Sequence, residues 1–459
     1  MKVRHLILWL SLLLIPSLMA SDASFWVWQR TTPLDSKEIA ALQQAGTKDL
    51  YWQVGTLALH DSHWVWRERF SVGFPVLRKL APFLHFIPVV RLEPKTGESV
   101  SAENFLQLLP ILDETVSATG ADMMQIDYES PDRLIPEYEN FLRSLNDHGR
   151  SWHLSITALG HWFKFANDFQ GLADEITPMF YDLNPKRESL SNDRLPPLID
   201  APVVEKQIAS WKSCKVPWKA GLPNFCRVSV VNPAGVSRGN IHSWELDELW
   251  FSPLLSPLQS TRDGESIFSV YRSGILADTP VHAQEKVIVR YPDLGALTRL
   301  KSIAESNGAT GTLYFRLADQ DDMSGYSVRA LSETASGSPT LTVHRTSSGC
   351  ITITNDSGYD LMPSISTLKE LRYTLKLKAA PGTWREAIPG KFAMITSEDE
   401  GSHSISNGIG LNVSTISFWF SHLRAGQSLE TGLVQNISPT PLRWSVPYVE
   451  LEPLWHPLE

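Results

Sequence analysis

Eight short apolar segments, separated by longer stretches, constrain the fold of this 459-residue chain more than any other feature. Alternation of short strands with helices is typical of βαβ units, whose strands form a parallel sheet. Eight such strands suit closure into a ring, so we expect a (β/α)8 barrel. The expected strands are Phe25–Arg30, Asp49–Gly55, Phe86–Glu93, Met123–Glu129, His153–Leu159, Ile176–Asp182, Lys219–Phe225 and Thr312–Leu317.

Four of the intervening stretches have the start signals or the apolar spacing of helices. Ser36–Ala45 and Ser101–Leu112 each open with a serine that can cap a helix. Ile135–Asp147 has apolar residues at helical spacing, and Val203–Ser213 follows a Pro-rich segment. These stretches are the predicted outer helices of the barrel.

The domain organisation follows from changes in composition along the chain. The barrel is predicted to span residues 21–331, with an inserted subdomain at about 227–285, because that connection is too long for a simple loop. Residues 332–340 are small and polar and are predicted to be a linker. Residues 341–459 contain β-branched and alternating segments separated by Gly, Asn, Asp and Pro, which predicts a β-sandwich.

Residues 1–20 have the composition of a secretory signal peptide. Lys2, Arg4 and His5 precede an apolar run from Leu6 to Leu18, and small residues follow it. A membrane anchor is the alternative, but this run contains a proline and falls short of the ~20 residues of a spanning helix. We therefore expect a secreted or periplasmic protein with no stable membrane span after signal cleavage.

Charge and cysteine usage exclude several classes of function. The net charge of −9 and the absence of a long Lys/Arg run argue against binding to nucleic acid, whose phosphates require cations. Cys214, Cys226 and Cys350 form no CxxC pair, and the histidines are scattered, so we predict neither a metal nor another cofactor. Cys214 and Cys226 could pair in an oxidising compartment, but the sequence leaves this open.

The fourth expected strand, in the stretch MMQIDYES, combines an apolar face with a polar one. Side chains alternate along a strand, so Gln125, Asp127 and Glu129 share one face. The opposite face carries Met124, Ile126 and Tyr128 and should pack on the helices. The polar row then lines the barrel interior and rises toward the C-terminal ends of the strands, where active sites of such barrels lie.

Two carboxylates at this spacing suit general acid catalysis. Asp127, which lies deeper, can hold a negative charge or share a proton with Glu129, and Glu129 can then protonate a leaving oxygen. The alternative is a buried hydrogen-bond network that only braces the barrel, because ion-pair networks produce the same pattern.

A second motif, MFYD at Met179–Asp182, ends the sixth expected strand. Together, DMMQIDYE and MFYD resemble the D-x-x-D-x-D-x-E and M-x-Y-D motifs of glycoside hydrolase family 18, the chitinase-like barrels. AGLPNF and GTLYFRL are similar to the seventh and eighth strands of that family, and the resemblance covers roughly residues 25 to 320. It implies a substrate-assisted retaining mechanism in which Glu129 donates the proton, Asp127 orients the acetamido group, and Tyr181 with Asp182 holds it.

The chain also departs from the family pattern. Gln125 replaces the second acid, Met123 a glycine, Tyr128 a tryptophan, and Phe315 the tryptophan that forms the floor of the sugar site. The start FWVWQR resembles the uncharacterised bacterial branch known as domain of unknown function 3142, a resemblance that implies no activity.

Polar and aromatic residues at other strand ends are further candidates for substrate contact. Besides Gln125 and Phe315, these are Trp28, Gln53, Arg91, Glu93 and Asn224. For Arg91 and Glu93 the alternative is a salt bridge between neighbouring strands, and for Trp28 it is core packing.

The leading hypothesis is a glycoside hydrolase that acts on a polysaccharide or oligosaccharide, with a 2-acetamido sugar implied by the family resemblance. One alternative is a carbohydrate-binding barrel that has lost turnover, and another is an interaction protein of the cell envelope. The sequence leaves the sugar, the linkage and the oligomeric state open.

Overall fold

The computed structural model describes most of the chain after the predicted signal peptide. The described residues are 23–94, 100–181, 190, 195–242, 244–258, 264–318, 324–332, 340–362, 372–399, 405–406, 413–437, 441–447 and 454–458. The signal peptide predicted at residues 1–20 and the candidate residue Asp182 lie outside these ranges, as does most of the linker predicted at 332–340. Within them, no helix is both long and apolar enough to cross a membrane.

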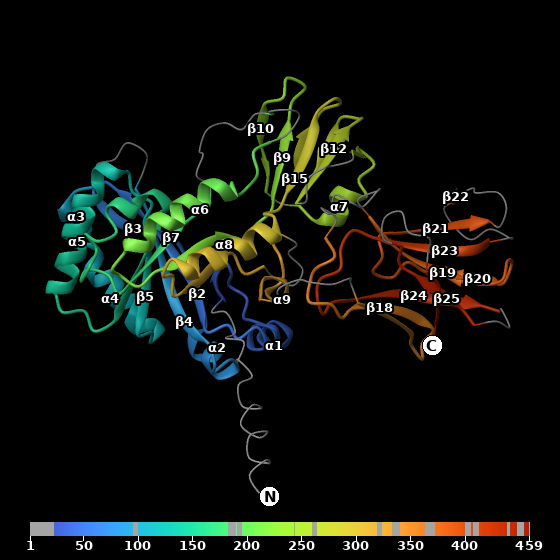
Figure 1. The fold of residues 1–459 in the computed structure, drawn as a ribbon, viewed down its shortest axis with the longest axis horizontal. Coiled ribbons are helices and arrows are strands. Elements are labelled where there is room, and N and C mark those ends of the chain that lie inside the picture. Colours follow the sequence, from blue (N-terminus) through green and yellow to red (C-terminus); the bar gives the residue numbers. More distant parts are fainter. Residues whose placement is uncertain are drawn as a thin grey trace, which may run out of the picture.

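Eight parallel strands in the described ranges close into a barrel. Its ring runs β1-β2-β4-β5-β6-β7-β8-β16, and β1 pairs with both β16 and β2, which closes it. The strands are β1 Ala23–Val27, β2 Asp49–His60, β4 His85–Pro94, β5 Met123–Asp127, β6 His153–Leu159, β7 Glu175–Met179, β8 Lys219–Pro223 and β16 Gly311–Phe315. All eight predicted strands are confirmed in position and order, and Figure 1 shows the barrel on the left.

The helices pack around this ring, and their ends follow local chemistry. They are α1 Ser36–Gln44, α2 Phe74–Leu80, α3 Ala102–Leu106, α4 Leu108–Thr119, η1 Asp132–Leu134, α5 Ile135–Asp147, α6 Ala201–Ser210, η3 Trp211–Ser213, α8 Leu294–Ser306 and α9 Val328–Ser332. The α1 cap is Asp35, one residue before the predicted Ser36, and forms a capping box with Glu38. After β6 the chain makes only the short 3-10 helix η2, Gly160–Lys164.

The single helix predicted at Ser101–Leu112 is two helices. Ser101 caps α3 as predicted, but α3 ends at Leu106 and α4 begins at Leu108. Pro110 explains the break, because a proline has no N–H for the carbonyl four residues earlier and its ring clashes there.

A hairpin extends one side of the barrel. β2 continues past its barrel partners and turns at residues 61–62 into β3, His63–Arg69, which runs antiparallel to it. The hairpin carries Arg67, which pairs with Glu93 near the C-terminal end of β4. The barrel mouth, which is the C-terminal end of the parallel strands, therefore has a raised wall on this side.

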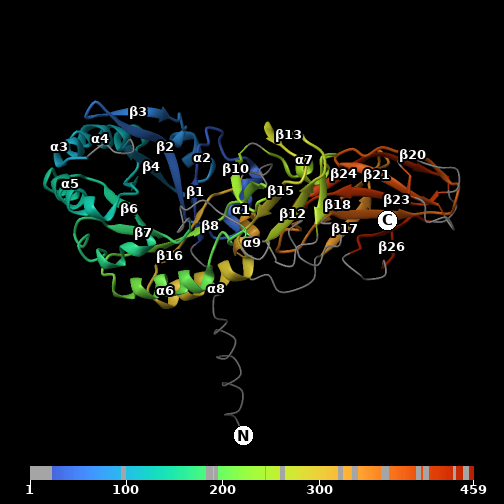
Figure 2. The same ribbon diagram turned by 90° about the horizontal axis from the view of Figure 1, so that it is seen from above.

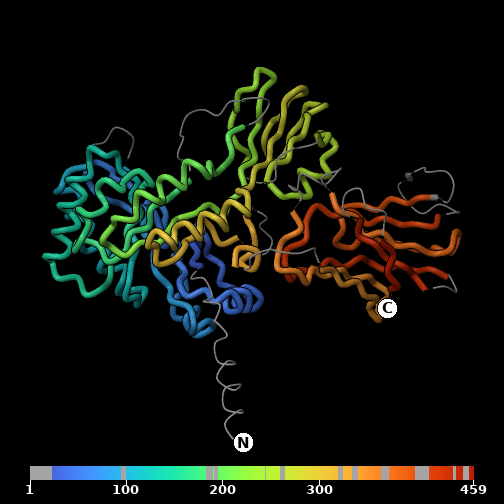
Figure 3. Tube along the Cα trace, viewed as in Figure 1, coloured from blue at the N-terminus to red at the C-terminus, as the bar shows by residue number. Residues whose placement is uncertain are grey.

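A five-stranded antiparallel sheet is inserted between β8 and β16. Its order is β10-β9-β15-β12-β11. The inserted elements are β9 Arg227–Val231, β10 Ser237–Ile241, α7 Leu246–Trp250, β11 Leu255–Leu258, β12 Glu265–Val270, the hairpin strands β13 Gly274–Leu276 and β14 Thr279–Val281, and β15 Lys286–Arg290. β15 ends five residues beyond the boundary expected near residue 285. Because β8 leads into β9 within four residues, this sheet stands at the barrel mouth (Figures 1 and 3).

The C-terminal region is a β-sandwich, as predicted. One sheet has the order β17-β18-β24-β20 and the other β22-β21-β23-β19-β25-β26. The strands are β17 Leu341–Arg345, β18 Cys350–Asn355, β19 Tyr373–Lys378, β20 Trp384–Ala387, β21 Met394–Asp399, β22 Ile405–Ser406, β23 Val413–Phe420, β24 Ser428–Asn436, β25 Arg443–Ser445 and β26 His456–Pro457. Alternate side chains such as Ile351, Ile353, Leu375 and Leu377 fill its core.

The sandwich contacts both the inserted sheet and the barrel. The Ser421 hydroxyl donates to Asp247 of α7 at 2.5 Å. On the barrel side, Asp360 accepts from the backbone N–H and the hydroxyl of Ser327, both at 2.7 Å. Figure 2 shows the barrel, the inserted sheet and the sandwich following one another along the long axis of the molecule.

Candidate active site

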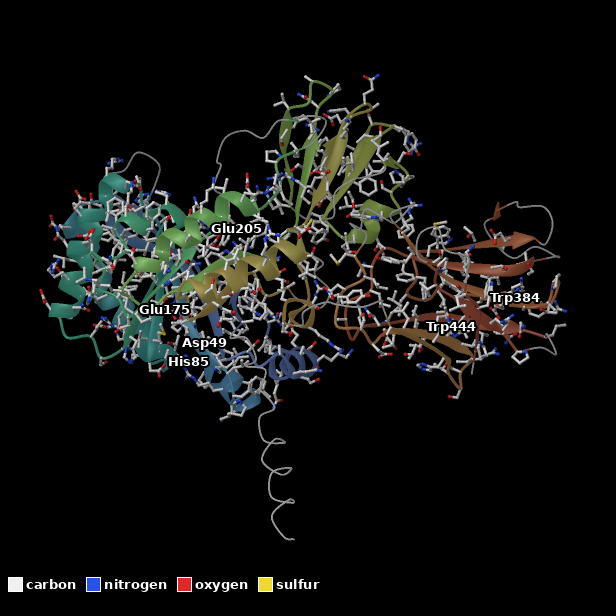
Figure 4. The ribbon with its side chains drawn as sticks, viewed as in Figure 1. Asp49, His85, Glu175, Glu205, Trp384 and Trp444 are labelled. Atoms are coloured by element: carbon white, nitrogen blue, oxygen red, sulfur yellow. The ribbon has the colours of Figure 1, made fainter. Side chains whose placement is uncertain are left out.

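The barrel interior is polar at the end opposite the mouth. Lys219 Nζ lies 2.5 Å from Asp49 Oδ2 and 3.5 Å from Glu175 Oε2, and it donates to the Tyr51 hydroxyl at 3.0 Å. These charged residues begin their strands, and Figure 4 shows Asp49, His85 and Glu175 in this part of the barrel. Burial alone would lower the pKa of Lys219, but Glu175 and Asp49 outweigh burial and raise it. The ion pairs offset the cost of burying these charges, and the cluster connects strands across the ring.

His85 connects two carboxylates at the same end. Its Nδ1 lies 3.3 Å from Asp49 and its Nε2 lies 2.6 Å from Asp122. The hydrogen bond with Asp49 raises the pKa of His85, burial opposes the rise, and Asp122 adds to it. Asp122, the first acid of the quoted motif, is therefore at the far end of β5 from the mouth.

Gln125 occupies the middle of the barrel and is fully buried. Trp26 Nε1 donates to its Oε1 at 2.6 Å, and its Nε2 donates to Ser155 at 3.0 Å and Thr177 at 3.4 Å. Both ends of the amide therefore bond to other barrel strands.

Asp127 lies one layer nearer the mouth, with 6% of its surface exposed. The Thr157 hydroxyl donates to its Oδ1 at 2.8 Å, and Arg91 Nε lies 3.7 Å from its Oδ2. Burial raises the pKa of Asp127 above its usual value, although Arg91 and Thr157 oppose the rise, and Glu93 adds to it. The carboxylate is thus held in one orientation by a neutral donor and a cation.

Glu129 differs from the expectation that all three polar side chains line the interior. Gln125 and Asp127 do, but β5 ends at Asp127, and Glu129 lies past the strand end with its side chain exposed. The alternating pattern persists for two residues more than the strand does. Glu129 therefore stands beyond the strand end, at the rim of the barrel.

An aromatic cluster occupies the opposite side of the mouth. The Tyr181 and Phe315 rings stack with centroids 5.7 Å apart and planes 23° apart. Trp28 meets Phe315 edge-on at 5.3 Å, and Phe225 lies 5.9 Å from Tyr181 and 6.2 Å from Phe315. Each of these four side chains is partly exposed, so the cluster offers an apolar surface at the mouth.

Arg91 joins the acidic and aromatic sides. It forms an ion pair with Glu93 at 2.9 Å, and its guanidinium lies 5.9 Å from the centre of the Trp28 ring. Glu93 also pairs with Arg67 of the β3 hairpin. Arg91 with Asp127 and Glu93 with Arg67 thus form the inter-strand ion pairs that were the alternative to substrate contact. Arg91 remains about one third exposed.

Gln53 and Asn224 hold loops. Gln53 is fully buried, accepts from the Gln29 N–H at 3.0 Å and donates to Thr56 at 3.2 Å. Asn224, also fully buried, accepts from the Tyr326 N–H at 2.8 Å and donates to the carbonyls of Arg316 and Tyr326.

A pocket of about 320 Å³ adjoins the aromatic cluster, between the barrel rim and the inserted sheet. Trp28, Phe225 and Phe315 line it from the barrel side, with Arg316. The inserted sheet and its flanking segments contribute Arg227, His242 and Trp244. These three were missed by sequence reasoning, because nothing in an inserted segment indicates which of its residues face the barrel.

Metal ligands are not grouped within the described ranges, where no three His, Cys, Asp or Glu residues could hold an ion. None of Cys214, Cys226 and Cys350 forms a disulfide. The pairing of Cys214 with Cys226 that the sequence left open is therefore not made.

Comparison with known proteins gives neighbours of low similarity. No family model matches the chain, and no curated protein matches it. Among solved structures, it is similar to a glycoside hydrolase family 18 N-acetylglucosaminidase from Paenibacillus barengoltzii, with 14% identity, 68% of this chain and 98% of that chain covered, and a TM-score of 0.43. The spore cortex-lytic enzyme SleL of Bacillus cereus gives 14% identity, 68% and 73% coverage and a TM-score of 0.43.

The chitinase ChiW of a Paenibacillus species covers more of this chain. The two sequences are 11% identical, the matched region covers 95% of this chain and 56% of ChiW, and the TM-score is 0.48. All three scores lie below 0.5.

Proposed function

We propose that the chain is a glycoside hydrolase in which Glu129 is the proton donor and Asp127 its charged partner. The observation that carries the proposal is a buried, oriented carboxylate at the end of β5 followed, two residues later, by an exposed one at the rim. Catalytic residues of (β/α)8 barrels lie at this end of the strands. The facing aromatic cluster supplies the apolar surface on which a sugar ring packs.

The chemistry assigns one role to each carboxyl group. Glu129, protonated, gives its proton to the glycosidic oxygen as the bond to the anomeric carbon breaks. Asp127, oriented by Thr157 and beside Arg91, stabilises in its ionised form the positive charge that develops. A water molecule then attacks the anomeric carbon and returns a proton to Glu129.

A 2-acetamido sugar would add substrate assistance to this scheme. Its acetamido oxygen would bond to the anomeric carbon as the leaving group departs, with Asp127 orienting the N–H. Tyr181, at the rim beside Phe315, would hold that group, and Asp182, beyond the described residues, would act with it. The family resemblance of the DMMQIDYE and MFYD motifs supports this scheme, and membership in the domain of unknown function 3142 branch stays a prediction.

Substrate contact falls to Trp28, Tyr181 and Phe315. The polar side-chain atoms of Gln125, Gln53 and Asn224 form hydrogen bonds with barrel and loop residues, and we assign these residues positioning roles. We assign Arg91 and Glu93 both substrate contact and positioning, since they pair with each other and border the mouth.

A carbohydrate-binding protein without turnover is the second candidate. The observation that favours it is the Arg91 guanidinium against Asp127, which neutralises part of the charge that catalysis would use. Such a protein would keep the aromatic cluster and bind sugars without cleaving them.

The experiment compares the wild type with Glu129→Gln on a panel of oligosaccharides that includes amino-sugar polymers. We expect cleavage by the wild type and a loss of at least ~100-fold in kcat for Glu129→Gln, with KM little changed, since general acid catalysis contributes that much. Glu205→Gln, on the outer helix α6 (Figure 4), is the control and should retain full activity.

Two other results would count against the hydrolase. Equal binding by wild type and Glu129→Gln without products would establish the non-catalytic candidate. Binding of no sugar at all would support the remaining alternative, an interaction protein of the cell envelope.

We also propose that the protein works outside the cytoplasm, as a secreted or periplasmic enzyme. The composition of residues 1–20 supports this.

A further inference from the structure

A cavity of about 650 Å³ lies in the inserted subdomain, between α7 and the hairpin of β13 and β14 (Figure 2). We call it the α7 cavity. Its apolar lining includes Phe251, Leu254, Ile275 and Leu276. All its described lining residues fall between residues 247 and 276, and none belongs to a barrel strand. The α7 cavity is therefore separate from the candidate active site.

The floor of the α7 cavity is held by its surroundings. Leu254 and Leu276 are buried and belong to the core that the inserted sheet shares with the barrel. The Arg372 guanidinium, from the sandwich, lies 4.9 Å from the centre of the Phe251 ring and donates to the Trp250 carbonyl at 2.6 Å. These contacts hold three of the side chains that form the cavity.

Apolar side chains also project beside the α7 cavity. Ile275, in the middle of β13, is 72% exposed, and Tyr271 is 59% exposed. The Tyr271 hydroxyl donates to the carbonyl of Pro253, a lining residue, which keeps the tyrosine ring at the edge of the cavity. Single exposed apolar residues are ordinary, but neighbouring ones around a concave surface are typical of an interaction site.

Charges of both signs border the same cavity. Arg272 is exposed, and within the described part of the chain it forms no hydrogen bond or ion pair. Glu248 is exposed too, and its Oε1 accepts from the Ala277 N–H at 2.9 Å, which leaves its other carboxylate oxygen for a further partner. A partner of one charge sign would leave one of these two side chains unmatched.

The lining argues against a sugar as the occupant. Phe251 is the one aromatic residue among the described lining residues, and the Arg372 guanidinium already lies against its ring. A sugar ring packs on an open aromatic face. The surface instead combines an apolar cavity, an apolar projection, a cation and a carboxylate, and such a set of features complements itself.

We propose that the α7 cavity and the Ile275 side chain beside it form the interface of a symmetric homodimer. In a twofold interface the same patch meets itself, so each contact occurs twice. Ile275 of each copy enters the cavity of the other copy, and Arg272 of each copy pairs with Glu248 of the other. The dimer is independent of the proposed hydrolase function, because none of these residues belongs to the barrel mouth.

The test is sedimentation velocity of the purified wild type between about 1 and about 100 μM, a range suited to a micromolar dissociation constant. We expect a shift from monomer to dimer as the concentration rises. Ile275→Asp should weaken the dimer ~10-fold or more, because it places a charge in an apolar cavity.

Ile437→Asp is the matched control. Ile437 is 61% exposed and follows β24, whose first residue lies near Arg424 and its contact with the barrel. Ile437 is therefore at the opposite end of that strand, and its substitution should leave the dimer unchanged.

A charge exchange tests the pairing between the two copies. Arg272→Glu and Glu248→Arg should each weaken the dimer, because like charges then face each other. The double variant has opposite charges again and should recover most of the wild-type affinity. Glu248→Arg also removes the acceptor for the Ala277 N–H, but the double variant lacks it too, so recovery reports the ion pair. Circular dichroism checks that each variant is folded.

A wild type that stays monomeric at about 100 μM would overturn the proposal and leave the α7 cavity to a partner of another kind. A dimer that Ile275→Asp weakens no more than Ile437→Asp does would place the interface elsewhere on the molecule. A folded double variant without recovered affinity would refute the pairing of Arg272 with Glu248.

Discussion

Asp127 owes its orientation to two contacts of different kinds. The Thr157 hydroxyl is a neutral, buried donor at 2.8 Å, and it also accepts from the Tyr128 N–H at 3.1 Å. Arg91 is a cation at 3.7 Å that remains about one third exposed, so solvent screens its attraction. The hydrogen bond from Thr157 therefore fixes the carboxylate in place, while Arg91 contributes charge.

Thr157→Val should shift the acid limb of the pH profile to higher pH. Thr157 lowers the pKa of Asp127, so its removal leaves burial less opposed and raises that pKa further. As pH falls, activity that needs ionised Asp127 would then be lost at a higher pH than in the wild type. The measurement is kcat/KM against pH for wild type, Thr157→Val and Thr157→Ser.

Thr157→Ser retains the hydroxyl and should restore the wild-type profile. A Thr157→Val profile that differs only in height, with its acid limb unmoved, would show that Thr157 supports the fold without acting on Asp127.

At the scale of elements, strands were predictable because their period is local. All eight predicted barrel strands form, but predictions such as Phe25–Arg30 and Met123–Glu129 run two or three residues past the observed C-terminal ends. The residues in that overshoot include Trp28, Glu129, Tyr181 and Phe225, which keep an apolar or alternating pattern because they line the mouth. The error in the strand ends thus marks the candidate site.

Contacts between elements were not predictable from local pattern. Arg91 faces Asp127 because β4 and β5 pair in a register that aligns them, and no property of either segment alone specifies that register. The charged cluster of Asp49, Glu175 and Lys219 was missed for the same reason. Its only signal is a charged residue at the start of three strands, which a surface position would also explain.

His85 links two of these elements and should make stability depend on pH. Its pKa is raised in the folded protein, so the stabilisation is fully present below the ordinary histidine value and is lost as pH rises through the folded value. We expect the melting temperature to fall as pH rises above about 6.5 and through the raised folded value, and His85→Gln to remove that part of the fall.

The comparison is by thermal unfolding monitored by circular dichroism. His63→Gln is the control, since His63 is an exposed histidine beside Gln107, and it should keep the wild-type dependence. If His85→Gln melted with an unchanged slope against pH, the contacts with Asp49 and Asp122 would contribute nothing that depends on protonation.

At the scale of the whole molecule, Asp360 ties the sandwich to the barrel. It is buried and accepts from the backbone N–H and hydroxyl of Ser327 and from the N–H of Ala425 at 2.9 Å. Beside it, Arg424 donates to the Gly325 carbonyl at 2.9 Å. Tyr326, between Gly325 and Ser327, bonds to Asn224 at the mouth, so the same short loop joins the sandwich to the candidate site.

Asp360→Ala should therefore uncouple the two units without unfolding either. Removing the carboxylate leaves three donors without their acceptor, at a cost of about 1–3 kcal/mol for each group that stays buried. We expect one calorimetric transition in the wild type and two in Asp360→Ala, with the aromatic core of the sandwich, around Trp384 (Figure 4), melting separately from the barrel. The control is Asp356→Asn, a change at an exposed residue nearby, which should keep the single transition. A single, unshifted transition in Asp360→Ala would instead mean that contacts with the inserted sheet hold the sandwich in place.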